Sequence, residues 1–521
     1  MPILTIDDDF LAQLCSAIVI DSQPVKTLKT VPLIECFSGE ELGQLPQSTL
    51  SDVSLAFERA RIAQEIWQKT SYDLRRRVFL RAHDAILREQ SSLIDLVQAE
   101  TGKSRGQAYE ELFSSAATTR YLAFKARSVL APKRKRSPIP VLIGTEVFQH
   151  PKGTIGVITP WNYPLSIAAF DVLPALISGN AVVQKIDNQA GLAVLQLRQI
   201  FVEAGLPPAL WQVVAGAGAT IGQAVVEAAD YVAFTGSTPT GIGVAKTSAE
   251  RLVGVSLELG GKNALLVLPD ADPKRAAKIA AYSCFSSQGQ LCVSTERIYL
   301  VGDVADAFEA AFVEELSRLK IGAGYHFDTD YGSLASAAQL KRLEEHVKDA
   351  VSKGATLLSG GVALPELGPF FFAPTVLKNV SEDMECFRTE TFGPLVSLYR
   401  VNSVNEAITA ANDSELGLNA SILTDRPARA KNIAQQLVSG SVNINEGYRA
   451  SFSSSSAPMG GVKKSGLGRR NGPEGILRYT NSQTVSVARR VISLPTTGRE
   501  FRVLAPVMTL LLRILKGISR A

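Results

Sequence analysis

Cys292 has the surroundings in this sequence that are most typical of a nucleophile. It lies in the segment FSSQGQLCVSTER (285–297), after a turn that contains glycine and before an apolar stretch with the pattern of a strand. A thiolate at such a junction can face a cleft, where backbone N–H groups can bind an oxyanion. Most cysteines are instead small buried apolar residues, and Cys284, on a predicted helix close to Tyr282, is interpreted in that way.

Two further polar residues follow predicted strands, where they could assist such a nucleophile. The segment TPWNYP (159–164) places Asn162 directly beyond a strand, so its amide could donate to a developing oxyanion. The segment LELGGK (257–262) holds Glu258 in an apolar stretch, where burying a carboxylate for packing alone would cost free energy. Because the carboxyl ends of parallel strands share one edge of a sheet, we expect these residues to meet in a cleft.

The segment FTGSTPTG (234–241) has a glycine spacing that suits a bound dinucleotide. It follows the apolar residues YVAF and precedes a predicted helix, whose first N–H groups could bind a pyrophosphate. A glycine turn of this kind is equally compatible with an ordinary tight turn. The motif alone therefore does not assign a ligand.

The elements that would position these residues alternate between strands and helices. Residues 52–131 have apolar positions spaced by three and four, which predicts surface helices. From 153 to about 267, and again from about 263 to 445, apolar strands alternate with helical stretches. The pattern predicts an α/β fold with two doubly wound parallel sheets, and a ligand cleft between them.

The composition excludes several other classes of protein. The 521 residues are 46% hydrophobic and 20% charged, which is typical of a globular chain and not of a disordered or coiled-coil one. Five cysteines without a CxxC pair and four histidines without metal-ligand spacing argue against a disulfide framework and a metal site. The N-terminus does not resemble a signal peptide, and no apolar stretch reaches about 18 residues, so a cytoplasmic protein is expected.

Positive charge is concentrated in the C-terminal tail. Residues 489–521 contain seven Arg or Lys and one Glu, whereas the whole chain has a net charge of +4. The rest of the chain lacks the excess of positive charge typical of nucleic-acid binding, and no such partner is predicted. Residues 491–521 are a basic amphipathic segment that either binds a membrane surface or docks on the protein body. Docking is favoured, because the apolar stretch is short and Pro506 interrupts it.

Six motifs, taken in order, resemble the aldehyde dehydrogenase superfamily: PWNYP, NAVVQK, FTGST, LELGGK, GQLC and ETFGP. The likeness covers about residues 30–485, and the sequences around GQLC and SGLG are most similar to NADP-type succinate-semialdehyde dehydrogenases of actinobacteria. The resemblance implies a nucleotide-binding domain (1–131 and 153–261), a catalytic domain (262–455) and a small β oligomerisation arm (132–152 and 456–490). A homodimer or homotetramer is expected, because the arm alone would leave strand edges open.

The resemblance also implies the chemistry of the predicted site. Cys292 would attack an aldehyde and form a thiohemiacetal, whose oxyanion is held by the Asn162 amide and the Cys292 backbone N–H. Glu258 would then activate the water that hydrolyses the thioester. The sequence therefore predicts NAD(P)-dependent oxidation of an aldehyde to its carboxylate.

The implied contacts of the cofactor lie in five of the six motifs, except for Asn188, which lies three residues after NAVVQK. They are Trp161, Asn162, Lys185, Asn188, Gly236, Ser237, Leu259 and Glu390. Many members that prefer NAD carry Glu where Asn188 stands, because its carboxylate repels a 2′-phosphate. The sequence therefore predicts that the enzyme prefers NADP to NAD. The neighbouring residue Asp187 carries a carboxylate, so use of NAD is also compatible with the sequence.

The predicted substrate is succinate semialdehyde, although part of the expected carboxylate site is missing. Two arginines that bind the carboxylate in better-known succinate-semialdehyde enzymes correspond here to Ser286 and Phe170, and only Ser453 matches their serine. A dehydrogenase for medium or long aliphatic or aromatic aldehydes is the alternative. A third alternative is a binding protein of the same fold without enzymatic activity. The presence of Cys292, Asn162 and Glu258 argues against it.

Overall fold

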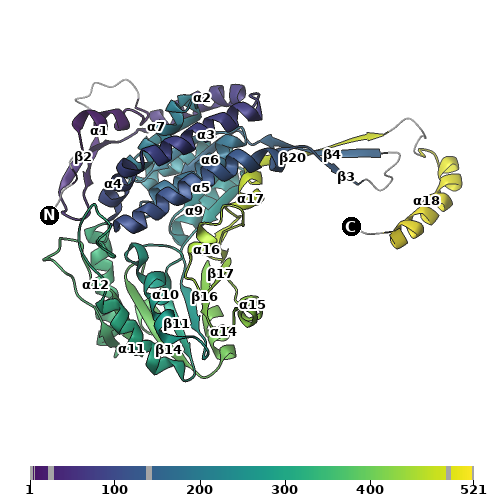
Figure 1. Cartoon of the computed structure of the whole chain (residues 1–521). Coiled ribbons are helices and arrows are strands. Elements are labelled where there is room, and N and C mark those ends of the chain that lie inside the picture. The colour runs from purple at the N-terminus through teal and green to yellow at the C-terminus, as the bar shows by residue number, and fades with distance from the viewer. Residues whose placement is uncertain (1–3, 5, 21–28, 137–142, 489–494, 519–521) are drawn as a thin grey trace. The chain divides into compact units, whose positions relative to one another are not determined.

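The computed structural model describes residues 4, 6–20, 29–136, 143–488 and 495–518. The chain divides into a large unit, Met1–Val129 with Pro151–Asn481, and a small unit, Leu130–His150 with Ser482–Ala521. Within the large unit, Figure 1 shows the long helices α2 to α5 on one side and a sheet with helices α10 and α11 at the other end.

The first sheet of the large unit is a parallel sheet with one antiparallel edge strand. Its order is β19-β9-β8-β5-β6-β7, in which β19 alone runs antiparallel. The strands are β5 Thr154–Ile158, β6 Ala181–Ile186, β7 Trp211–Ala215, β8 Tyr231–Thr235, β9 Val255–Glu258 and β19 Gly466–Leu467. Strands β5 to β8 are buried along their whole length, as expected for a sheet covered on both faces.

Helices connect and cover these strands. They are α1 Asp8–Cys15, α2 Leu50–Trp67, α3 Tyr72–Arg88, α4 Gln90–Thr101, α5 Arg105–Leu130, α6 Pro164–Ile177, α7 Leu192–Glu203, α8 Gln223–Ala228 and α9 Thr238–Glu250. Helix α2 begins with a reciprocal cap, in which Thr49 N–H donates to the Asp52 carboxylate and Asp52 N–H to the Thr49 hydroxyl. Helices α2 to α5 confirm the helical region expected over 52–131. A hairpin of β1 Thr30–Ile34 and β2 Glu41–Pro46 precedes them.

The second sheet has seven strands in the order β12-β13-β14-β11-β10-β16-β17, and β12 alone is antiparallel. The strands are β10 Asn263–Val267, β11 Thr295–Val301, β12 Thr356–Ser359, β13 Thr375–Lys378, β14 Leu395–Val401, β16 Asn419–Leu423 and β17 Ser441–Ile444. Its helices are α10 Pro273–Phe285, α11 Val304–Ser317, α12 Ala337–Ser352, α13 Glu385–Arg388, α14 Val404–Asn412, α15 Pro427–Ala434 and α16 Arg449–Phe452, whereas α17 Gly472–Leu477 contacts α6 of the first sheet. Two apolar cores flank this sheet, so the predicted fold of two doubly wound α/β sheets is confirmed.

The small unit contains a three-stranded sheet and a helix. The sheet order is β20-β4-β3, formed by β3 Lys133–Lys135, β4 Ile143–Pro151 and β20 Thr480–Ala488, and the helix is α18 Gly498–Ile518. The second arm segment, expected over 456–490, differs in the structure, because 456–481 belongs to the large unit. There β19 pairs with β9, β18 Val462–Lys463 pairs with β15 Leu416–Gly417, and Arg470 forms a buried ion pair with Asp171.

Candidate active site

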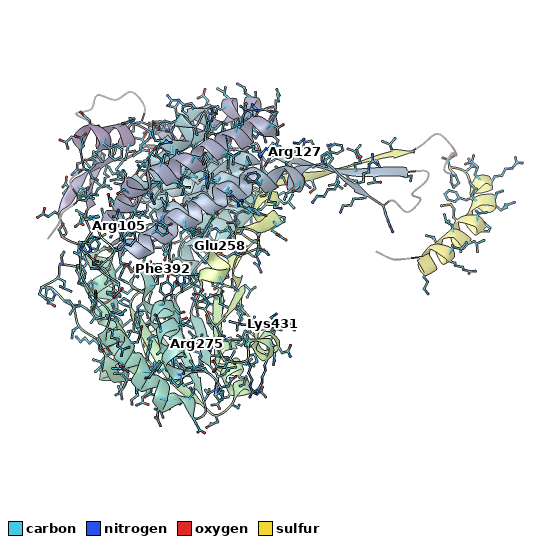
Figure 2. All side chains as sticks on the ribbon, viewed as in Figure 1. Arg105, Arg127, Glu258, Arg275, Phe392 and Lys431 are labelled. Carbon is cyan, nitrogen blue, oxygen red and sulfur yellow. The ribbon has the colours of Figure 1, made fainter. Side chains whose placement is uncertain are left out.

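A cavity of about 170 Å³ lies beyond the carboxyl ends of β5, β8 and β9. Its lining brings together Asn162, Glu258 and Cys292, as expected from the three motifs. The register explains this: Ile158 pairs with Phe234 and Thr235 with Glu258, so the three strands end side by side. Phe392 also lines the cavity. Figure 2 shows Glu258 and Phe392 between helices α2 to α5 and the second sheet of the large unit.

The turn before Cys292 has a strained backbone. Ser287, Gln288 and Gly289 have φ angles of 50°, 54° and 66°, so three successive residues lie in the left-handed region. Only glycine adopts this conformation without cost, and such strain is characteristic of functional sites. A Cβ on Gly289 would also overlap the carbonyl group of Gly393. The turn is therefore held in one conformation by contact with the ETFGP segment.

Two asparagines bind the backbone carbonyls of Cys292 and of the two residues that follow it. The Asn263 amide donates to the carbonyl oxygens of Cys292 and Ser294, each at 2.7 Å, and Asn419 N–H donates to Asn263 Oδ1 at 3.0 Å. The Asn419 amide donates in turn to Val293 O at 3.2 Å. Neither residue is among those predicted from the sequence. The available signal for Asn263 was a polar residue at the start of an otherwise apolar strand.

Burial keeps the Cys292 thiol protonated at neutral pH. Loss of solvation raises the pKa of this thiol to about 12, and the nearby carboxylates of Glu390 and Glu258 add to the rise. A thiolate is the reactive form of cysteine. The site therefore needs a base, or a change in its charges, before Cys292 can attack.

Glu258 has the properties of such a base. Burial raises the pKa of its carboxyl to about 7, although the guanidinium groups of Arg470 and Arg478 oppose the rise. Its Oε1 is buried and accepts no hydrogen bond from the described residues. A carboxylate that titrates near neutral pH and belongs to a residue lining the cavity can accept a proton from a thiol or from water.

Asn162 lies on a loop that buried ionic groups hold in place. Glu111 accepts the N–H groups of Leu165 and Ser166, each at 3.1 Å, at the start of α6, and forms an ion pair with buried Lys103. The Asn162 amide donates to Gln290 O at 2.9 Å through one of its two hydrogens. The second hydrogen has no protein acceptor within hydrogen-bond distance among the described residues, so it can donate to an oxyanion at the cavity.

The residues predicted to bind a dinucleotide fall into two groups. Six of them line the same cavity: Asn162, described above, with Trp161, Gly236, Ser237, Leu259 and Glu390. Lys185 and Asn188 lie apart from this lining, at and just beyond the end of β6. Ser237 precedes α9 without capping it through its side chain, which leaves the first N–H groups of the helix for a pyrophosphate. The residues therefore fit a nicotinamide dinucleotide.

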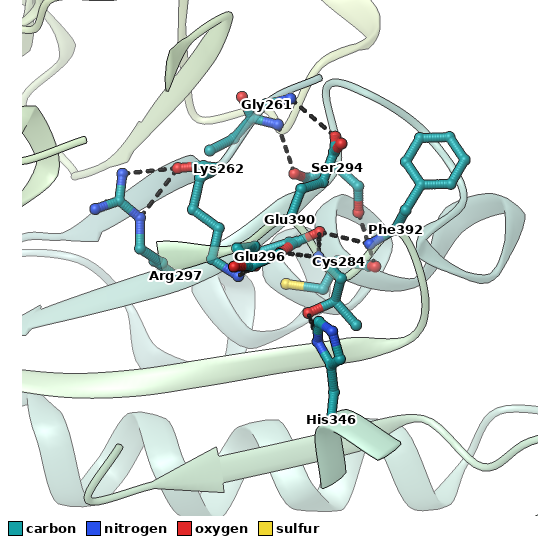
Figure 3. Close-up of polar contacts among 12 residues, drawn as sticks. Gly261, Lys262, Cys284, Ser294, Glu296, Arg297, His346, Glu390 and Phe392 are labelled. Atoms are coloured by element: carbon teal, nitrogen blue, oxygen red, sulfur yellow. Dashed lines mark hydrogen bonds and ion pairs between the residues drawn. The ribbon is translucent and has the colours of Figure 1, made fainter. Parts of the chain in front are cut away.

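The ion pair of Lys262 and Glu296 binds the backbone on both sides of Glu390: Lys262 donates to Thr389 O at 2.9 Å, and Glu296 accepts the N–H of Thr391 at 2.9 Å (Figure 3). Oε1 of Glu390 accepts the N–H of Gly261 at 2.8 Å. Burial raises the pKa of the Glu390 carboxyl to about 7, and the carboxylate of Glu296 adds to the rise. A side chain on Gly260 would overlap the Glu390 carboxylate, which explains why LELGGK needs glycine at this position.

Comparison with known proteins gives the family. The sequence profile of the aldehyde dehydrogenase family matches residues 23–485. The chain belongs to the aldehyde dehydrogenase family. It is an NAD(P)-dependent oxidoreductase that converts an aldehyde to a carboxylate, so the reading as a binding protein without activity is set aside.

Relatives of this aldehyde dehydrogenase carry more specific names. A Mycolicibacterium smegmatis protein with the provisional name succinate-semialdehyde dehydrogenase (NADP+) is 45% identical over 507 residues, which cover 97% of this chain and 98% of that one. A similarly named protein of Mycobacterium tuberculosis H37Rv is 44% identical over 92% of each chain.

Solved structures agree with this assignment. An NADP-dependent enzyme of E. coli has a TM-score of 0.85 at 30% identity, covering 88% of this chain and 95% of that one. Betaine aldehyde dehydrogenase of Staphylococcus aureus, solved with NAD+, has a TM-score of 0.87 at 29% identity, covering 93% and 97%.

The structure also identifies cavity residues of this aldehyde dehydrogenase that the sequence analysis missed. Phe392 has a φ of 55°, and its ring meets that of Trp161 edge to face with 5.7 Å between the centroids. Gln339 and Arg342, from α12, complete the lining. Phe392 lies within the ETFGP motif, which was recognised, whereas no signal in the sequence marks the two residues of α12.

Cys292 also packs against a cluster that is rich in aromatic side chains. This apolar cluster is formed by Tyr163, Ile167, Phe170, Leu291, Val293, Leu418, Tyr448, Phe452 and Met459. The Ser286 hydroxyl lies 2.7 Å from that of Tyr448. Ser453, the residue predicted to bind substrate, lies just after α16 with its hydroxyl 3.5 Å from that of Ser114, and it is not part of the cavity lining.

Proposed function

We propose that this enzyme oxidises succinate semialdehyde to succinate and prefers NADP to NAD. The names of the mycobacterial relatives, at 44 to 45% identity over at least nine-tenths of the chain, support the substrate. The chemistry rests on one observation: Cys292, Asn162 and Glu258 line a single cavity together with five of the predicted dinucleotide residues.

In this proposal the chain supplies a nucleophile, an oxyanion site and a base. The Cys292 thiolate adds to the aldehyde carbon, and the new oxyanion is bound by the Asn162 amide and the Cys292 N–H. A dinucleotide held by the predicted cofactor residues would supply the acceptor for the hydride that leaves this carbon, and loss of that hydride converts the thiohemiacetal to a thioester. Glu258 takes a proton from water as the water attacks the thioester, the C–S bond breaks, and the thiolate of Cys292 is restored.

The preference for NADP rests on the surroundings of Asn188. Its amide and that of Gln47 form two hydrogen bonds of 3.1 and 3.3 Å with each other, so a neutral pair occupies the place of a repelling carboxylate. Lys185, at the end of β6, adds a cation nearby on the chain. A 2′-phosphate would meet no carboxylate from Asn188 itself, which supports binding of NADP.

Oxidation of an apolar aldehyde is the second candidate, and the aromatic cluster next to Cys292 favours it. The rings of Phe170 and Phe452 pack edge to face with 5.3 Å between their centroids. The Ser286 hydroxyl forms a hydrogen bond with the hydroxyl of Tyr448. A ring or an alkyl chain would gain from burial there.

Substrate profiling separates the two candidates. The value of kcat/KM should be measured for succinate semialdehyde, octanal and benzaldehyde, with NADP and with NAD, by absorbance of the reduced nicotinamide. The proposal expects the highest value for succinate semialdehyde with NADP. A higher value for octanal or benzaldehyde would establish the second candidate.

We also propose a homodimer or homotetramer built through the arm, in the cytoplasm. In the sheet of the small unit, β3 and β20 are edge strands, and pairing with another copy would cover them. All five cysteines are free, which suits a reducing compartment. Light scattering coupled to gel filtration measures the mass of the assembly, and a monomer would contradict the proposal.

A further inference from the structure

Helix α18 separates cationic and apolar side chains onto different faces. At 3.6 residues per turn, Arg499, Arg502, Arg513 and Lys516 fall within an arc of about 100°. Glu500 is the single acidic residue of the helix, and its carboxylate accepts the N–H groups of Thr496 and Thr497 at 2.6 and 3.1 Å. At about 100° per residue, Glu500 falls outside the arc of the four cations, so this cationic face carries positive charge alone.

The apolar face is wide and exposed in the single chain. The largest exposed fractions are those of Val503 (68%), Val507 (61%), Leu512 (61%), Leu510 (57%), Ile514 (50%) and Phe501 (48%). Together with the other apolar residues they cover an arc of about 220°. A helix that packs on a protein needs an apolar stripe of roughly 100°. An arc twice as wide, with cations on the rest, suits a helix half immersed in a lipid interface.

The helix also continues through Pro506, which changes the expectation drawn from the sequence. Docking on the protein body was favoured because the proline would shorten the apolar stretch. In the structure the residues on both sides of Pro506 belong to one helix of 21 residues. Their apolar side chains therefore form one continuous face.

We propose that α18 binds the surface of a bilayer that contains anionic phospholipid. The helix lies in the plane of the interface, with its apolar face among the acyl chains and its Arg and Lys side chains at the lipid phosphates. It does not span the bilayer, because no helix in the described part of the chain is both long and apolar enough to do so.

Charge decides between a bilayer and a second copy of the helix. If two copies of α18 packed through their apolar faces, their cationic side chains would repel one another. Glu500 is the only acidic residue of the helix that could pair with them. Phosphate groups of anionic lipids supply the missing charge. If the arm joins copies of the chain, several helices reach the same surface, which strengthens an attachment that one helix makes only weakly.

The experiment is co-sedimentation of the full-length enzyme with vesicles of equal parts phosphatidylglycerol and phosphatidylcholine, and with vesicles of phosphatidylcholine alone. A double variant, Arg513→Glu with Lys516→Glu, reverses two charges of the cationic face. The matched control, Arg429→Glu with Lys431→Glu, reverses two exposed charges on α15. Intact aldehyde oxidation verifies that each variant is folded, and the assembly mass of each variant is measured as a separate result.

We expect binding to the anionic vesicles that falls by about 10- to 30-fold in the α18 variant and stays unchanged in the α15 control. A second variant, Leu510→Ser with Leu512→Ser, should lose binding although its charges are intact. Equal sedimentation of all variants, or no binding by the full-length enzyme, would overturn the proposal. A fall in assembly mass in the α18 variants would also overturn the proposal, and would assign the helix to contact between copies. A fall in melting temperature without vesicle binding would overturn it as well, and would assign the helix to docking on the body.

Discussion

Lys262 and Glu296 form a buried ion pair in which Nζ lies 2.5 Å from Oε2. The same carboxylate accepts the N–H groups of Thr391 and Phe392 at 2.9 to 3.0 Å. The backbone that carries Glu390 is therefore attached to β11 through one side chain. This attachment fixes a residue predicted to contact the cofactor.

Replacing Glu296 by Gln should weaken cofactor binding more than turnover. The variant keeps the shape of the side chain but leaves the Lys262 ammonium without its anion, which should destabilise the fold by about 3 to 5 kcal/mol. We expect the KM for NADP to rise about tenfold, with a smaller change in kcat. Glu314→Gln, which removes an exposed carboxylate that pairs with Arg318, serves as the control. An unchanged KM in Glu296→Gln would contradict this role.

Cys292→Ala and Glu258→Gln should fail at different steps. Cys292→Ala should form no reduced cofactor even in the first turnover, whereas Cys284→Ala should remain active because Cys284 is buried away from the cavity lining. Glu258→Gln should give a burst of at most one reduced cofactor per site in stopped-flow absorbance and then stall as a thioester, visible by intact mass spectrometry. Steady turnover in either site variant would refute that residue's role. No burst in Glu258→Gln would mean that Glu258 also activates the thiol.

The rate after the burst should fall as the pH drops below 7. The Glu258 carboxyl has its pKa raised to about 7, so it gains a proton below that pH and can no longer act as a base. We expect the wild-type rate to fall about tenfold per pH unit there, and the residual slow phase of Glu258→Gln to be flat. The same slope in the variant would assign the dependence to Glu390, whose pKa is also about 7.

Asn188→Glu should shift the cofactor preference towards NAD. The new carboxylate would stand close to a 2′-phosphate, and we expect kcat/KM for NADP to fall by about 10- to 100-fold relative to NAD. Asn188→Gln keeps a neutral amide and controls for the lost pairing with Gln47. An enzyme that already prefers NAD, or an unchanged ratio in Asn188→Glu, would show the prediction to be wrong.

Gly289→Ala should impair both stability and activity. Its added methyl group would overlap the Gly393 carbonyl in a backbone with a φ of 66°, so the turn before Cys292 must shift. We expect a loss of about 1 to 3 kcal/mol in the free energy of unfolding, measured by denaturant titration, and a fall in kcat. Gly243→Ala, where a Cβ would meet open space in α9, should be neutral or slightly stabilising. Equal stability of the two variants would contradict the role of the turn.

The sequence alone was sufficient for the fold class and the family. Strand and helix patterns are local, because burial on two faces dictates continuous apolar strands and helices repeat every three to four residues. Cys292, Asn162 and Glu258 were recognisable for the same reason: each lies in a short motif next to a predicted strand. Their roles in catalysis stay predictions.

Only the tertiary structure could determine what holds these residues in place. Asn263 reaches the Cys292 carbonyl across 29 positions of the chain, and Glu111 reaches the start of α6 across 54. The residues from 456 to 481 look like an extension of the arm in the sequence, but pairing of β19 with β9 assigns them to the large unit. Such contacts depend on which segments the fold brings together. Patterns among neighbouring residues do not predict these long-range contacts. Hydrogen bonds and ion pairs depend on distance in space and not on separation along the chain.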